Sequence, residues 1–266
     1  MSPTESASQN FRLDGKTAVI TGGGRGIGRA IALTFASRGA KAAILDLDQA
    51  AAEEVAREAG GAQSGAVAYR CDVGDAESVH AAFAQILARG PIDILVNNAG
   101  IAFVGDVENT AEKDLDTLYR VNVKSVYLCA RECLGSMKKN GGGVILNLAS
   151  IAASSGLADR FAYSMSKGAV RAMTLSIAKD YIGDNIRCNC ISPARVHTPF
   201  VDNFVKKNYP GREKEMMQEL ATSQPIGRMG DPHEIAMLAL FLCSDAASFI
   251  TGSDYSIDGG FLTLRG

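Results

Sequence analysis

The chain has 266 residues, of which 47% are hydrophobic and 21% charged, and its formal net charge is −2. Without an excess of basic residues there is no field to gather phosphates, so nucleic acid and anionic membranes are excluded as expected partners. No apolar run reaches the roughly 20 residues that span a bilayer, and residues 1–10 lack the apolar core of a signal peptide. We therefore expect a cytoplasmic protein with a flexible tail at residues 1–10.

Short β-branched runs alternate with longer helical segments along the chain. The expected strands are 16–21, 41–46, 66–70, 94–97, 143–149, 187–191 and 254–257. The expected helices are 26–37, 49–59, 76–88, 112–139, 162–181 and 233–242. Strands separated by helices favour right-handed crossovers. The pattern predicts an α/β protein with a Rossmann-like three-layer fold and a mostly parallel sheet, as a single domain over residues 11–266.

One long stretch, about residues 192–224, has no clear periodicity and is rich in charged and aromatic residues. Long loops in compact domains are often lids or binding loops. This one follows the carboxyl end of a strand, where open α/β sheets bind ligands. We therefore expect it to be a substrate-binding loop.

The six cysteines are distributed along the chain without a C-x-x-C pair. Two pairs have spacings that place them on one face of an element, Cys129 with Cys133 and Cys188 with Cys190. A zinc site normally takes four ligands, and no histidine lies near either pair in the sequence. We expect buried free thiols and no metal site.

A glycine-rich loop connects the first expected strand to the first helix. Glycine is needed where backbone turns tightly or touches a phosphate, and a helix amino terminus favours an anion. The strand–loop–helix context is the one that a dinucleotide site requires. The predicted cofactor-binding residues in the loop are Gly22, Arg25, Gly26, Ile27 and Gly28.

The second strand ends at Asp46, 24 residues after Gly22. A carboxylate at this point can accept hydrogen bonds from the adenosine ribose hydroxyls and would repel a 2′-phosphate. At about 4 Å and an effective dielectric near 20, the repulsion is on the order of 4 kcal/mol per unit charge. Arg25 would offset part of it. The sequence favours NAD over NADP.

Tyr163 and Lys167 lie four residues apart, on the same face of an expected helix. A tyrosine with its ordinary pKa of about 10 is a poor base at neutral pH. A nearby ammonium group, together with a positive nicotinamide ring, would favour the phenolate. Alone, this spacing is uninformative, and its weight depends on the motifs around it.

Taken together, the motifs resemble those of the short-chain dehydrogenase/reductase family over nearly the whole chain after the tail. The matching features are Thr21–Gly28, Asp72 after the third strand, Asn97-Asn98-Ala99-Gly100, Asn122, Ser150, Tyr163 and Lys167. The resemblance implies a seven-stranded Rossmann-like sheet, a nicotinamide cofactor and a homotetramer.

The resemblance also implies catalytic roles. Tyr163 would exchange a proton with the substrate hydroxyl, and Ser150 would hydrogen-bond the same oxygen. Lys167 would lower the tyrosine pKa and hold the nicotinamide ribose, while Asn122 would anchor a water. Ser150 as a helix cap and Asn122 as a buried structural residue are the alternative interpretations.

For the cofactor, the resemblance implies that Asp72 receives the adenine amino group and that Asn98 lines the cofactor channel. The remaining predicted contacts are Val73, Ala99, Gly100, Val196 and Thr198, besides Tyr163 and Lys167. One departure stands in Pro193-Ala194-Arg195, where the family usually has Pro-Gly. Because alanine tolerates positive φ poorly, the opening of this loop is expected to differ.

The predicted substrate-binding residues are Ser150, Tyr163, Arg160 and Arg195, with Arg228 as a further possible anion partner. The segment around Arg160 resembles a subgroup that includes cytosolic 3-hydroxybutyrate dehydrogenase-like enzymes and dehydrogenases of 2-keto-3-deoxy sugar acids. An arginine can grip a carboxylate through two parallel hydrogen bonds. A solvated or salt-bridged Arg160 is the alternative.

The leading hypothesis is an NAD-dependent dehydrogenase that oxidises a secondary alcohol of a small hydroxylated acid, a sugar acid or deoxy sugar acid. A neutral sugar or polyol dehydrogenase and a 3-oxoacyl-thioester reductase are alternatives with the same chemistry. A binding protein that senses NAD without turning it over is an alternative of another class.

Overall fold

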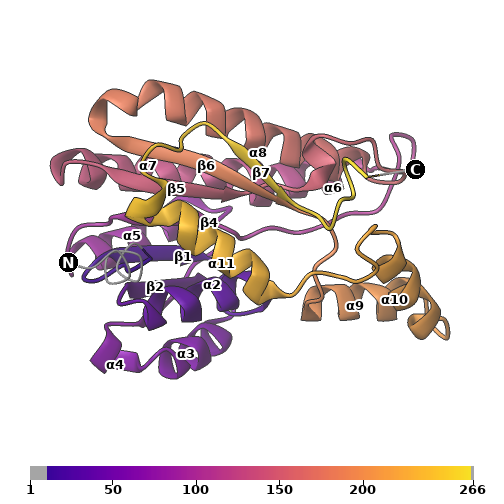
Figure 1. Cartoon of the computed structure of the whole chain (residues 1–266), viewed down its shortest axis with the longest axis horizontal. Helices are drawn as coiled ribbons and strands as arrows, with labels where there is room; N and C mark the ends of the chain where they lie inside the picture. The colour runs from indigo at the N-terminus through magenta and orange to yellow at the C-terminus, as the bar shows by residue number, and fades with distance from the viewer. Residues whose placement is uncertain (1–10, 265–266) are drawn as a thin grey trace.

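Seven strands form one parallel sheet in the order β3-β2-β1-β4-β5-β6-β7 in the computed structural model, which describes residues 11–264 (Figure 1). The strands are β1 (Thr17–Thr21), β2 (Lys41–Asp46), β3 (Val67–Arg70), β4 (Ile94–Asn97), β5 (Gly143–Leu148), β6 (Ile186–Pro193) and β7 (Asp254–Ile257). The predicted Rossmann-like single-domain fold is confirmed. The expected tail at residues 1–10 lies outside the described residues.

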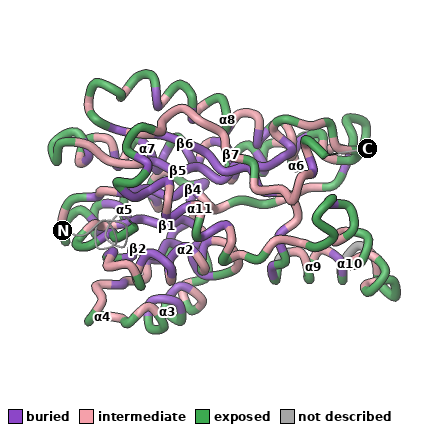
Figure 2. Tube along the Cα trace, in the orientation of Figure 1, coloured by how far each residue is buried: buried purple, intermediate pink, exposed green. Residues whose placement is uncertain are grey.

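Helices cover both faces of this sheet. The main helices are α2 (Gly26–Ser37), α3 (Gln49–Glu58), α5 (Ala76–Leu87), α6 (Glu112–Leu118), α7 (Ser125–Lys139), α8 (Phe161–Asp180), α9 (Pro199–Asn208), α10 (Glu213–Thr222) and α11 (Pro232–Cys243). A short turn of helix, α4 (Gly61–Ser64), follows α3. One apolar core joins the sheet to α2, α3 and α11, and the other joins it to α5, α7 and α8. Figure 2 shows the buried chain concentrated along the strands between these layers.

The sequence determines these elements locally. Every residue of β4 is buried, as expected for a central strand with helices on both faces. Side chains cap several helix starts: Asp48 accepts from the Ala51 backbone N–H, and Asp231 forms a capping box with Glu234. These caps fix where the loops end and therefore where the loop side chains lie.

Two expected elements differ from the observed ones. The continuous helix expected at 112–139 is divided by a π-helical segment, Tyr119–Lys124. The loop expected at about 192–224 contains α9 and α10, and Pro199 begins α9 behind a Thr198 cap. These two helices project from the sheet as a separate lobe (Figure 1). The sequence interpretation missed them because their pattern of charges is irregular.

Candidate active site

A cavity of about 770 Å³ opens at the carboxyl ends of the strands. It runs from Asp46 and Asp72 after β2 and β3, past the glycine loop, to Tyr163 on α8. Phe204 of α9 and Leu220 of α10 line it as well, so the lobe formed by α9 and α10 provides one wall. The strand order reverses between β1 and β4, and open α/β sheets bind ligands at such a switch point.

The glycine loop after β1 is held tightly against the turn after β4. Gly22 has a φ of 63°, and a Cβ there would lie 2.9 Å from the Ala99 Cα. Asn98 donates from Nδ2 to the carbonyl oxygens of Thr21 and Gly22 at 2.9 and 3.0 Å. Asn98 therefore fixes the loop in addition to lining the cavity. Only glycine fits at this approach.

At the adenosine end, Asp46 is fixed by two backbone donors. Its Oδ2 accepts from Gly24 N at 2.9 Å and its Oδ1 from Asp48 N at 3.0 Å. Arg25 forms an ion pair with Asp48. Arg25, the cation that could neutralise a 2′-phosphate here, is thus already paired. The Asp46 carboxylate remains at the cavity wall.

Asp72 forms an ion pair that the sequence interpretation missed. Arg120, in the π-helical segment, donates from Nη1 to Asp72 Oδ2 at 3.0 Å, and Gly74 N donates to Oδ1 at 2.9 Å. Burial raises the pKa of Asp72, but the hydrogen bonds and the charge of Arg120 outweigh it, and the pKa ends below its ordinary value. Asp72 is thus an oriented carboxylate at the cavity edge.

At the other end, Tyr163 shares a hydrogen bond with Ser150. Burial raises the pKa of Tyr163, while this hydrogen bond and the positive charges of Arg160 and Arg195 oppose the rise. Ser150 also accepts from Ala152 N at 3.2 Å and caps the 3-10 turn Ile151–Ala153. Ser150 therefore both caps this turn and lies beside Tyr163.

Lys167 lies beside Tyr163, with its Nζ 5.9 Å from the centre of the tyrosine ring. The Nζ donates to the Leu148 carbonyl oxygen at 2.7 Å. Burial lowers the pKa of Lys167 to about 8. The ammonium is therefore close to its titration point near neutral pH and directed toward the carboxyl end of β5.

Asn122 is buried beneath the site and does not line the cavity. Its side chain accepts from Ile101 N at 2.8 Å and donates to the Ile101 carbonyl at 2.9 Å. It also donates to Ser166 Oγ at 3.0 Å, one residue before Lys167. These contacts fit the structural alternative for Asn122: it ties the loop after β4 to α8.

Two arginines approach Tyr163 from different segments. Arg195 follows β6, and its Nε is buried without a hydrogen-bond partner. Burial lowers the pKa of Arg195, and so does the charge of Arg160, while the Tyr163 and Tyr209 hydroxyls oppose this. The Arg160 guanidinium carbon lies 5.6 Å from the centre of the Phe204 ring on α9. Neither guanidinium has a carboxylate within ion-pair distance among residues 11–264.

Of the remaining predicted residues, Gly28 does not line the cavity. A Cβ on Gly28 would lie 2.1 Å from the Gly22 carbonyl oxygen, so this glycine lets α2 pack on the loop. Arg228 pairs with Glu234 through two hydrogen bonds at 2.8 Å and is not part of the lining. The other predicted contacts line the cavity: Gly22, Arg25, Gly26, Ile27, Asp46, Asp72, Val73, Asn98, Ala99, Gly100, Ser150, Arg160, Tyr163, Lys167, Arg195, Val196 and Thr198.

The described residues contain no cluster of three or more side chains that could hold a metal ion. All six cysteines are free and buried. Among helices within residues 11–264, none is both long and apolar enough to cross a membrane.

Comparison with known proteins identifies the family. A family model described as Enoyl-(Acyl carrier protein) reductase matches residues 22–262. D-threitol dehydrogenase of Mycolicibacterium smegmatis is 40% identical over 253 residues, covering 95% of both chains. 2-Keto-3-deoxy-L-fuconate dehydrogenase of Xanthomonas campestris is 37% identical over 254 residues, covering 95% of this chain and 82% of the relative.

Among solved structures, L-sorbose reductase from Gluconobacter frateurii, complexed with NADPH and L-sorbose, superposes with a TM-score of 0.90. It is 33% identical, and the match covers 96% of this chain and 100% of the other. The resemblance found in the sequence is confirmed. The chain belongs to the short-chain dehydrogenase/reductase family and is an oxidoreductase that acts on a CH–OH group with a nicotinamide cofactor.

Proposed function

We propose that the protein is an NAD-dependent dehydrogenase that oxidises a secondary alcohol of a small hydroxylated acid to a ketone. The assignment of an acidic substrate rests on two arginines, Arg160 and Arg195, that lie beside Tyr163. Arg195 is half-buried and its buried Nε has no hydrogen-bond partner, which is costly because no opposite charge offsets the desolvation. A substrate carboxylate would supply that charge, and arginine suits it through paired hydrogen bonds.

The preference for NAD rests on Asp46 and Arg25. Gly24 and Gly26 have no side chain to hinder a pyrophosphate at the start of α2. The Asp46 carboxylate is an acceptor for ribose hydroxyls and repels a 2′-phosphate. Arg25 is engaged by Asp48 and is therefore less available to neutralise such a phosphate. These residues fit NAD.

In the proposed mechanism, the substrate carboxylate binds Arg195 and Arg160, and the reacting hydroxyl lies against Ser150 and Tyr163. Ser150 orients this oxygen, and the Tyr163 phenolate removes its proton. Lys167 contributes positive charge that favours the phenolate. The bound nicotinamide supplies the hydride acceptor. The apolar wall formed by Phe204 and Leu220 excludes water from this end.

The test is NADH formation from NAD⁺ with sugar acids, 3-hydroxy acids and the matched neutral sugars and polyols. Wild type, Arg160→Ala and Arg195→Ala are assayed in parallel. We expect acids to react and each substitution to raise KM for acids by tenfold or more, since a charge-assisted hydrogen bond contributes roughly 1.5–3 kcal/mol. Reaction of neutral substrates only, with both variants silent, would disprove the carboxylate assignment and leave the dehydrogenase chemistry intact.

A neutral polyol dehydrogenase is the second candidate. The observation that favours it is the 40% identity to D-threitol dehydrogenase, together with the likeness to L-sorbose reductase. In that case Arg160 and Arg195 would donate to substrate hydroxyls. The same panel separates the candidates, because a polyol and the acid of equal carbon number differ only in the group that would meet the arginines.

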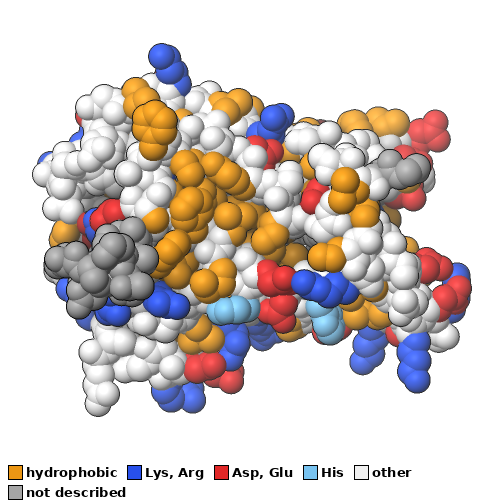
Figure 3. Space-filling view, viewed as in Figure 1, with side chains coloured by type: hydrophobic (Ala, Val, Ile, Leu, Met, Phe, Trp, Pro, Cys, Tyr) orange, Lys and Arg blue, Asp and Glu red, His pale blue; other side chains and the backbone are white. Residues whose placement is uncertain are grey.

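We also propose a homotetramer in the cytoplasm. Strand β7 pairs only with β6 and is an open edge of the sheet. Figure 3 shows hydrophobic side chains gathered over the middle of the face where Figure 1 places α11 and β7. Exposed Met237 on α11 and Phe249 before β7 belong to this region of the chain. Light scattering coupled to gel filtration measures the mass; a monomer would contradict the proposal.

A further inference from the structure

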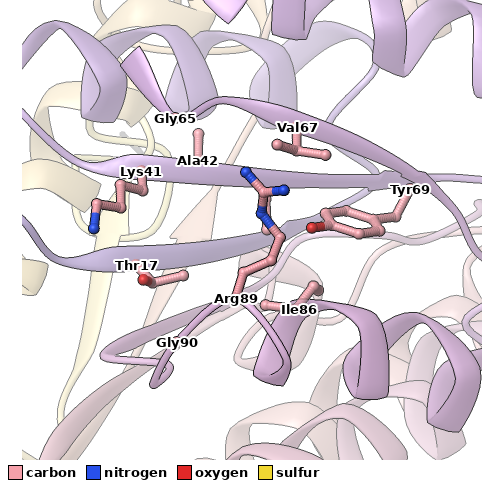
Figure 4. Close-up of a pocket in the computed structure, with 10 residues that line it drawn as sticks. Thr17, Lys41, Ala42, Gly65, Val67, Tyr69, Ile86, Arg89 and Gly90 are labelled. Atoms are coloured by element: carbon pink, nitrogen blue, oxygen red, sulfur yellow. The ribbon is translucent and has the colours of Figure 1, made fainter. Parts of the chain in front are cut away.

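A second cavity, of about 380 Å³, lies at the opposite edge of the sheet from the active site. Thr17, Lys41 and Val67 line it at the amino ends of β1, β2 and β3. Ile86, Arg89 and Gly90 close it from the carboxyl end of α5 (Figure 4). Its volume is within the range of small-molecule sites, about 300–1,000 Å³.

One wall of this cavity carries the hydroxyl of a largely buried tyrosine, Tyr69. Tyr69 is only 8% exposed, and its hydroxyl makes no hydrogen bond to any described residue. In Figure 4 the hydroxyl points toward the Arg89 side chain that extends over the strands. Burial raises the pKa of Tyr69, which keeps the phenol neutral and able to donate at pH 7. Because this hydroxyl reaches the cavity and has no protein partner, it is free to donate to a ligand there.

The charge around this hydroxyl is positive. Arg89 and Lys41 both line the cavity, and no carboxylate among the described residues lies within ion-pair distance of either. The stem of Lys41 packs on Gly65, where an added Cβ would meet the Lys41 Cγ at 3.0 Å. None of the lining residues is acidic. An anion would meet two cations and a phenol donor.

The floor of the cavity is apolar. Ala43 of β2, Val67 of β3 and Ile86 of α5, which belong to one core cluster, present aliphatic groups to it. An inorganic ion would leave this apolar floor exposed to water, whereas the apolar part of an organic anion would cover it. We propose that this cavity is a binding site for a small organic oxyanion, a carboxylate or phosphate ester with an apolar body of about one ring. Arg89 and Tyr69 hold the oxyanion, and the aliphatic floor holds the body.

The experiment is calorimetric titration of the full chain with benzoate, phenyl phosphate and the neutral analogue benzamide. Because Arg160 and Arg195 are expected to take anions as well, each titration is repeated on the Arg160→Ala/Arg195→Ala double variant. We expect the double variant to retain one anion site, which benzamide does not fill, and wild type to show this site in addition to the one at Arg160 and Arg195. The tighter of the two anions identifies whether the natural group is a carboxylate or a phosphate ester.

Substitutions then locate the site. Arg89→Gln should weaken anion binding tenfold or more, and Tyr69→Phe threefold or more, in line with lost charged and neutral hydrogen bonds. Arg57→Gln is the matched control, an exposed arginine on α3 away from the cavity. Unchanged thermal midpoints exclude misfolding. Binding that does not depend on Arg89, equal binding of benzamide, or no binding of either anion up to about 10 mM overturns the proposal.

Discussion

Lys167 donates a hydrogen bond from its Nζ to the Leu148 carbonyl oxygen across 2.7 Å, which places a buried ammonium at the carboxyl end of β5. The side chain is 6% exposed, and burial lowers its pKa from 10.5 to about 8. The folded protein therefore maintains a charge in a site that disfavours it. Buried charges with a shifted pKa are typical of functional sites, where the shifted pKa is used in the chemistry.

This burial predicts a pH-dependent stability difference between wild type and Lys167→Met. Below pH 8 the lysine is protonated in both the folded and unfolded states, and its burial cost is constant. Between pH 8 and 10.5 the folded state releases the proton while the unfolded state keeps it, so wild-type stability rises relative to the variant. The full gain is on the order of 3 kcal/mol, at about 1.4 kcal/mol per pKa unit.

Urea unfolding of both proteins at pH 7.5 and 9.5 measures the part of this gain that develops between those two pH values, about half of it. Lys179→Met is the matched control, since Lys179 is exposed on the same helix. Its stability should remain at a constant offset from wild type at both pH values. Parallel curves for Lys167→Met and wild type would mean that the Lys167 pKa is close to its ordinary value.

Asp46 predicts the cofactor preference. In Asp46→Asn the carboxylate charge is removed, while the amide oxygen can still accept from Gly24 N. We expect kcat/KM with NADP to rise about tenfold, because solvent and salt screen most of the repulsion of roughly 4 kcal/mol. Steady-state kinetics with both cofactors tests this. Asp180→Asn, an exposed change of equal charge at the end of α8, should leave the ratio of NADP to NAD use unaltered.

The fold and much of the site could be predicted because their signals are local. A strand–glycine–helix segment defines its own turn, and Tyr163 with Lys167 needs only a helix. Ser150 follows directly after an expected strand, and Asn122 lies within an expected helix, so both could be placed from short stretches of sequence. Such features place side chains at the carboxyl edge of the sheet once the strands are parallel.

The remaining features depend on contacts between distant segments. The Arg120–Asp72 pair requires the π-helical turn, which a continuous helical pattern does not reveal. The contact of Arg160 with Phe204 depends on where α9 lies relative to the start of α8. The cavity around Tyr69 exists only where the amino ends of three strands meet the end of α5. No periodicity signals these arrangements.

The Arg120–Asp72 pair predicts an effect on cofactor binding without an effect on chemistry. Arg120→Ala leaves the Asp72 carboxylate held by Gly74 N alone, so its orientation toward the adenine that we expect it to bind becomes less defined. We expect KM for NAD to rise about twofold to fivefold, because a partly exposed ion pair contributes at most about 1 kcal/mol, with kcat unchanged. Arg120→Lys should restore part of the affinity. A fall in kcat at unchanged KM would show instead that the π-helical segment acts on the catalytic end.

Two glycine substitutions of equal size predict opposite effects on stability. A Cβ at Gly28 would lie 2.1 Å from the Gly22 carbonyl oxygen and 2.5 Å from Asn98 Nδ2, so Gly28→Ala must move the loop backbone. Gly135, exposed within α7, has nothing within 4 Å of an added Cβ. Gly28→Ala should cost about 1–3 kcal/mol through overpacking, whereas Gly135→Ala should add about 0.5–1 kcal/mol of helix stability.

Chemical denaturation of both variants measures these changes, and titration with NADH measures the cofactor site. Because Gly28 supports the loop through Gly22, Gly28→Ala should also weaken NADH binding by tenfold or more, a change of about 1.4 kcal/mol. Gly135→Ala should bind NADH as wild type does, since α7 lies behind the sheet from the loop. If Gly28→Ala kept both wild-type stability and affinity, the loop would have to relax without loss, and the close packing of α2 on Gly22 would not constrain the cofactor site.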